Sequence, residues 1–90
     1  MTSEEKGGPQ KITVTVFSPR SPEPKQFTWL KTMKIGDAAD EAAKAFGYEP
    51  GGTPPTFIKD GKVLDRNKPF VAEGVKDGDS LELVAGGGGV

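Results

Sequence analysis

The chain of 90 residues contains no cysteine and no histidine. Without cysteine it has no disulfide framework, no thiolate metal site and no cysteine nucleophile. The absence of histidine removes the usual general base and the commonest zinc ligand. We therefore expect a protein that is not an enzyme and that binds no metal and no cofactor of its own.

The chain also lacks an excess of charge of either sign and a long hydrophobic run. Its 12 basic and 13 acidic residues give a formal net charge of −1, so no polybasic stripe is available for nucleic acid or a membrane surface. No apolar stretch reaches the length that crosses a bilayer, and the first residues do not resemble a signal peptide. We expect a cytoplasmic, monomeric protein whose partners are other proteins.

What the chain has in abundance is glycine and proline, with 13 and 8 residues respectively. Ninety residues suffice for one small domain. Residues 1–10 are polar and end in a Gly-Gly-Pro-Gln sequence, so we expect a disordered tail there. The sequence predicts one folded domain over 11–85 and a flexible, glycine-rich tail over 86–90.

The first part of the domain reads as a hairpin. Residues 11–17 alternate with period two and predict a strand whose inward residues are Ile12, Val14 and Val16. The prolines that follow predict a long loop over 18–25, because proline donates no N–H to a sheet. A second strand is expected over 26–30, with Phe27 and Trp29 in the core.

A helix is expected next, because the hydrophobic period changes from two to that of an α-helix. Its apolar stripe is formed by Ile35, Ala38, Ala39, Ala42 and Phe46. The helix starts between Lys34 and Asp37, and Gly47 is the expected stop in the left-handed conformation. An alanine stripe indicates a helix that lies close on a sheet.

A second, tighter hairpin is expected around Asp60-Gly61. These two residues accommodate positive φ and follow the short strand-like run 56–59. The partner strand is expected over 62–64. The sheet therefore contains a two-residue turn between two short strands.

The last part of the domain leads to the tail. Residues 65–79 read as a loop or short helical turn anchored by Phe70 and Val75. The final strand is expected over 80–84 with alternate residues inward, and only Ala85 separates it from the glycines.

The order of these elements resembles the ubiquitin-like β-grasp family. The resemblance covers about residues 10–89 and is most specific over 57–64, at Phe70 and Gly74-Val75, and over 79–84, where spacing matches ubiquitin without a gap. It implies an α+β fold in which a mixed four- to five-stranded sheet packs on one helix, with the first and last strands parallel neighbours.

The resemblance also implies a role for the tail. In ubiquitin-like modifiers, an ATP-dependent activating enzyme adenylates a terminal glycine carboxylate and passes it to a thiol, and a conjugating step joins it to a lysine of a target protein. Gly88 and Gly89 match that requirement, whereas Val90 caps the last glycine and implies a processing peptidase. We expect a ubiquitin-like modifier precursor activated at Gly89 after Val90 is removed.

Two alternatives remain open. A sulfur carrier of the same fold would convert the glycine carboxylate to a thiocarboxylate, but such carriers usually expose the terminal glycines without a cap. A non-covalent β-grasp binding module would leave the tail inert.

By the same resemblance, Ile58 and Val84 stand where ubiquitin has its apolar recognition patch. Glu82 replaces a histidine of that patch and indicates a different set of partners. Lys62 stands at a chain-linkage lysine and is a candidate acceptor. The prolines, the absent thiols and the short arm before the tail together suggest a prokaryotic modifier.

Overall fold

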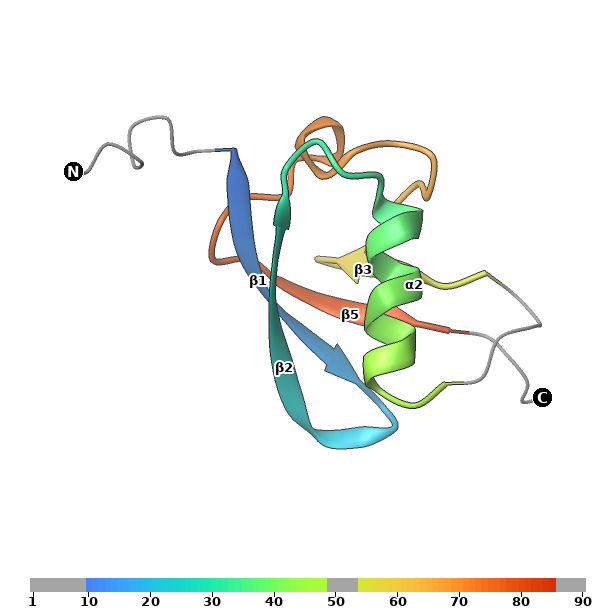
Figure 1. Ribbon diagram of the computed structural model, residues 1–90. Coiled ribbons are helices and arrows are strands. Elements are labelled where there is room, and N and C mark those ends of the chain that lie inside the picture. Colours follow the sequence, from blue (N-terminus) through green and yellow to red (C-terminus); the bar gives the residue numbers. More distant parts are fainter. Residues whose placement is uncertain (1–9, 49–53, 86–90) are drawn as a thin grey trace.

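The computed structural model describes residues 10–48 and 54–85. It has a five-stranded mixed sheet with the helix α2 lying across one face (Figure 1). The fold is the predicted α+β β-grasp arrangement. Its elements are β1 (Lys11–Ser18), β2 (Ser21–Leu30), α2 (Ile35–Ala45), β3 (Thr56–Lys59), β4 (Lys62–Val63), the 3₁₀ helix η1 (Phe70–Glu73) and β5 (Ser80–Val84).

The strands are arranged in the order β2-β1-β5-β3-β4, which places β5 at the centre of the sheet. As predicted, β1 and β5 run parallel, with Val16 opposite Leu81. The other neighbouring strands are antiparallel. The last strand is therefore held on both sides before the chain reaches the tail.

The core lies between the sheet and α2. Trp29 is buried at 6% exposure, which confirms the register predicted for the second strand. Phe27 is only partly buried and stacks on Trp29 with 4.7 Å between ring centroids, so it covers the edge of the core. The fully buried large side chains are Phe57, Phe70, Ile35, Leu81, Leu83, Val14 and Val16.

The helix is confirmed in both its position and its buried face. It begins at Ile35, and Gly47 follows it with a φ of 86°. Phe46 packs partly buried against the core. The small side chains of the buried face, Ala38, Ala39, Ala42 and Ala43, bring the helix close to the sheet.

The predicted turn and loop anchors are also confirmed. Asp60 and Gly61 both have positive φ, 53° and 82°, as a tight hairpin turn requires. Phe70 and Val75 are buried and hold η1 and its flanks against the core.

The prediction of a long proline loop over 18–25 is wrong, because β2 begins at Ser21. The strand lies at the edge of the sheet, and its register shifts between the pair Val16–Lys25 and the pair Ser18–Ser21. Pro22 and Pro24 fall within that irregular stretch. Proline is tolerated at edges and bulges because no ladder hydrogen bond depends on its missing N–H.

Candidate functional site

Gly88, Gly89 and Val90 lie outside the described residues, so the site is built from the strand that leads to them. In β5, Val84 pairs with Thr56 at the start of β3, and only Ala85 follows before the glycines. The direction in which the chain leaves the domain is therefore fixed by the pairing of β5 with β3.

The structure brings Ile58, Glu82 and Val84 together on the face of the sheet opposite α2. Ile58 and Glu82 are direct cross-strand partners, and Val84 lies two residues beyond Glu82 on the same side of β5. Val84 is 36% exposed, Glu82 is exposed and Ile58 is half-buried. The three residues predicted to form a partner-binding patch are thus neighbours on an accessible surface.

The sequence reading missed two members of this surface, Phe17 and Val63. Phe17 pairs with Glu82 across β1 and β5, and Val63 pairs with Ile58 across β3 and β4. They are 46% and 61% exposed. The alternation of β1 contained the signal, because it places Ile12, Val14 and Val16 inward and therefore Phe17 outward.

Phe17, Glu82, Ile58 and Val63 therefore form one row across four strands, which we call the outer rung. Residues that pair directly across neighbouring strands point to the same face. An open hollow of about 240 Å³ beside this row is lined by Phe17, Ile58, Asp60, Gly61, Ser80, Leu81 and Glu82. The outer rung therefore combines apolar side chains with the carboxylate of Glu82, and Asp60 adds a second carboxylate at the hollow.

Lys62, the candidate acceptor, does not belong to this row. It pairs with Lys59 across the hairpin, and its Nζ lies 3.4 Å from Oε1 of Glu73. The Lys62 side chain is 70% exposed, whereas that of Glu73 is only 7% exposed. The amine is accessible to a partner and is oriented by a nearly buried carboxylate.

Lys59 differs from Lys62 because two carboxylates surround its amine. The hydrogen bond to Asp60 and the charges of Asp60 and Asp79 raise the pKa of Lys59 above its ordinary value of 10.5. The Nζ lies 3.2 Å from Asp60 and 3.7 Å from Asp79. The two carboxylates therefore favour the protonated form of the Lys59 amine.

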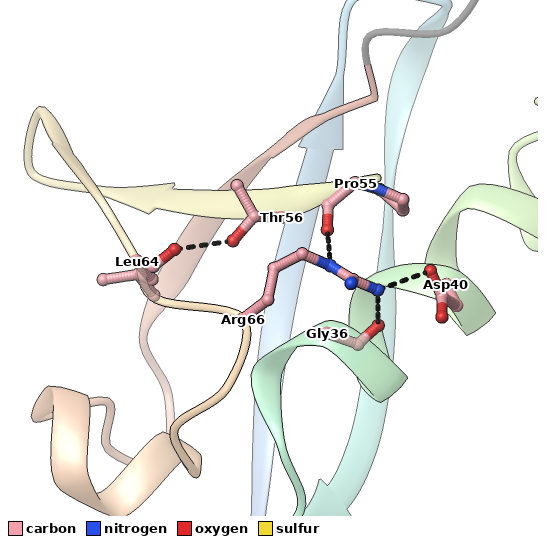
Figure 2. Close-up of polar contacts among 6 residues, drawn as sticks. All are labelled: Gly36, Asp40, Pro55, Thr56, Leu64 and Arg66. Atoms are coloured by element: carbon pink, nitrogen blue, oxygen red, sulfur yellow. Dashed lines mark hydrogen bonds and ion pairs between the residues drawn. The ribbon is translucent and has the colours of Figure 1, made fainter. Parts of the chain in front are cut away.

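Arg66 holds the beginning of β3 against the beginning of α2 (Figure 2). Its Nε donates to the carbonyl of Pro55 at 2.7 Å. Its Nη2 donates to the carbonyl of Gly36 at 3.2 Å and to Asp40 Oδ1 at 3.0 Å. This clasp fixes the strand end that pairs with Val84, and the sequence alone did not reveal it.

Within residues 10–48 and 54–85, no cluster of histidine, cysteine, aspartate or glutamate has the composition of a metal site. In the same part of the chain, no helix is both long and apolar enough to span a bilayer.

Comparison with known proteins identifies the fold. A scan against protein-family models found no match, and neither did a search of curated proteins. The chain is similar to a solved structure from work on molecular mimicry of SUMO that promotes DNA repair, with a TM-score of 0.73 and 17% identity over 84% of this chain and 92% of that chain. It is similar to the ubiquitin of Caldiarchaeum subterraneum, with a TM-score of 0.67 and 16% identity over 86% of this chain and 99% of that chain.

A similar fold also occurs in an enzyme complex. A chain of toluene 4-monooxygenase bound to 4-bromobenzoate aligns with a TM-score of 0.70 and 10% identity, over 82% of this chain and 96% of that chain. At such identities the likeness establishes the ubiquitin-like β-grasp fold and leaves the function to the residues.

Proposed function

We propose that this protein is the precursor of a ubiquitin-like protein modifier and is not itself an enzyme. The observation that carries the proposal is the ubiquitin-like fold whose central strand ends one residue before four glycines and a terminal valine. Glycines without side chains suit a peptide that must enter a narrow active site. The prokaryotic, cytoplasmic and monomeric character expected from the sequence belongs to the same proposal.

Maturation requires a processing peptidase. Water adds across the Gly89–Val90 peptide bond, valine leaves, and Gly89 becomes the terminal carboxylate. The short arm, with Ala85 as the only residue between β5 and the glycines, requires the peptidase and the later partners to approach close to the folded domain.

Conjugation then proceeds through an ATP-dependent activating enzyme. The Gly89 carboxylate attacks the α-phosphate of ATP and pyrophosphate leaves. A thiol of the activating enzyme displaces AMP, the acyl group passes to the thiol of a conjugating enzyme, and a neutral lysine amine of a target protein displaces that thiol. The amine loses its proton as the isopeptide bond forms. Among its own lysines, the exposed Lys62 is the candidate acceptor for chain formation.

The decisive experiment is mass spectrometry of the protein and its conjugates from the native host. We expect free chains that have lost Val90 and target lysines that carry the glycine remnant. A terminal thiocarboxylate would instead support the sulfur-carrier alternative. An uncut chain found only free, while neighbouring genes of the host are expressed, would support the non-covalent module.

Variants separate processing from activation. A chain that ends at Gly89 should conjugate without the peptidase, whereas the same chain with Gly89→Ala should not be activated. Gly86→Ala in that shortened chain is the matched control, because it adds the same methyl group farther from the reacting carboxylate and should reduce conjugation less. Equal conjugation by all three chains would contradict the proposed tail chemistry.

A further inference from the structure

The ion pair between Lys62 and Glu73 differs from the other ion pairs within residues 10–48 and 54–85 in the exposure of its two members. Its carboxylate side chain is only 7% exposed, whereas the lysine side chain is 70% exposed. In the other pairs the carboxylate is the more exposed partner, at 51% for Asp40, 88% for Asp60 and 27% for Asp79. The pair therefore joins a nearly buried anion to a cation that is open to chemistry.

Glu73 is held in place by the backbone around it. It is the last residue of η1, and Gly74 ends the turn in the left-handed conformation with a φ of 78°. The N–H of Val75 donates to the carbonyl of Phe70 at 3.1 Å, and both of these side chains are buried. Among the described residues, Lys62 is the only cation that forms an ion pair with Glu73. A nearly buried carboxylate on a fixed segment thus depends on one lysine of the neighbouring hairpin.

Acylation of Lys62 removes this cation. The neutral amine attacks the carbonyl carbon of a thioester, the carbon–sulfur bond breaks, and the nitrogen loses a proton as the amide forms. The product has one N–H and no charge, so Glu73 loses its counter-charge. Removing one partner of a buried ion pair is strongly destabilising, because the remaining charge is left without compensation.

We propose that the Lys62–Glu73 pair makes the fold sensitive to acylation: an acyl group on Lys62 leaves the Glu73 carboxylate unpaired and loosens η1 from the β3–β4 hairpin. The free and the acylated domain then differ in how readily a defined segment opens, which a protease or another partner can distinguish. The inference applies to any acyl group on this amine. It therefore stands apart from the chemistry of the glycine tail.

The test compares the full chain with a full chain that carries acetyl-lysine at position 62, by hydrogen exchange of the backbone amides. The N–H of Gly74 and the N–H of Val75 both donate to carbonyls of η1. They should exchange at least about tenfold faster after acetylation, because opening of η1 returns the unpaired carboxylate to water. The amide of Tyr48, which donates to Ala43 at the far end of α2, is the internal reference and should change less.

Three further chains separate charge from bulk. Acetyl-lysine at position 68 removes the charge of an exposed lysine that forms no ion pair within residues 10–48 and 54–85, so exchange at η1 should stay nearly the same. Lys62→Arg keeps a cation and should exchange like the unmodified chain. Glu73→Gln replaces the carboxylate by a neutral amide of nearly equal size, and in that background acetylation of Lys62 should no longer accelerate exchange.

Several outcomes would overturn the inference. Equal acceleration with and without Glu73→Gln would assign the effect to the bulk of the acetyl group. Equal acceleration by acetylation at position 68 would assign it to net charge, and no acceleration at η1 would show that the carboxylate does not need its cation. If Glu73→Gln alone opens η1 as far as acetylation does, the pair itself holds the segment and the unpaired carboxylate is not the cause.

Discussion

The contact between Gly36 and Arg66 determines how much stability the protein loses when Gly36→Ala adds a methyl group to α2. A Cβ at position 36 would lie 2.8 Å from the guanidinium carbon of Arg66 and 2.9 Å from its Nη2. These separations are too short for any real side chain. Gly36→Ala must therefore shift the guanidinium end of the Arg66 side chain, which weakens the clasp drawn in Figure 2.

The size of the effect follows from the bonds that are lost. Arg66 donates to the carbonyls of Pro55 and Gly36 and to the carboxylate of Asp40. Each hydrogen bond from a charged donor is worth about 1.5–3 kcal/mol when buried. Since the Arg66 and Asp40 side chains are 33% and 51% exposed, solvent screening reduces the total loss to about 2 kcal/mol.

Alanine in place of glycine returns at most about 1 kcal/mol through its higher helix propensity. Gly36→Ala should therefore lower the free energy of unfolding by about 1–2 kcal/mol. In a domain of this size that corresponds to a fall in Tm of roughly 4–15 °C.

A double-mutant cycle measured by urea denaturation tests this reasoning. Arg66→Ala alone should cost about 2 kcal/mol, because it removes the clasp. In that background Gly36→Ala meets no guanidinium group and should become neutral or stabilising by up to about 1 kcal/mol. The coupling between the two positions should thus be about 2 kcal/mol.

Gly47→Ala is the control for this cycle. Gly47 has a φ of 86° and no neighbouring atom within 4 Å of the added methyl group. Its cost, about 1 kcal/mol from backbone strain, should be the same with and without Arg66. If Gly36→Ala costs the same in both backgrounds, the steric explanation is refuted and the penalty must arise within the helix.

Three further predictions concern the core, the tight turn and the partly buried Lys59. Phe57→Ala removes a fully buried ring and should lower the free energy of unfolding, measured by urea denaturation, by about 3–5 kcal/mol. Phe57→Leu should lower it much less. Similar losses for the two variants would mean that the surrounding side chains collapse into the cavity. Gly61→Ala should cost about 1 kcal/mol because residue 61 has a φ of 82°, and an unchanged denaturation midpoint would contradict the strain. Asp60→Asn should lower the pKa of Lys59 towards 10.5, as measured by NMR of the lysine ε-methylene group. An unchanged pKa would show that Asp60 does not cause the shift. Since the folded pKa is raised, the stabilisation from Lys59 is complete below pH 10.5 and is lost as the pH rises through the folded value.

The parts of the fold that were predicted correctly are those in which local pattern and tertiary packing agree. The alternation around Val14 and around Leu81 places the same residues inward in the sequence and in the structure. The turn at Asp60-Gly61 depends only on its own backbone conformation. For such elements, the nearest neighbours in the chain contain sufficient information.

The error at β2 has a different origin. Proline excludes a strand only in the interior of a sheet, where each residue must donate its N–H to a neighbouring strand. Whether a strand lies at an edge depends on the order of all strands, and β2 pairs with β1 alone. The tolerance of Pro22 and Pro24 therefore follows from topology that no local window contains.

The candidate site was predicted in part for the same reason. Ile58, Glu82 and Val84 were selected by their resemblance to a known patch, whereas Phe17 joins them only through the parallel pairing of β1 and β5. The clasp of Arg66 is even harder to predict from the sequence, because its partners include the backbone carbonyl groups of Gly36 and Pro55. Backbone acceptors are common to every residue, so composition cannot identify them.

The central position of β5 explains why the outer face of the sheet and the tail can be tested separately. The strand carries Glu82 on its outer face, and the buried Leu81 and Leu83 hold it in the core. Val84 and Ala85 separate Leu83 from the glycine tail. Substitutions of the exposed Glu82 change the outer surface without removing an inward anchor of the strand. Changes to the terminal glycines likewise leave both anchors in place. The outer face and the tail can therefore be altered one at a time while the fold is retained.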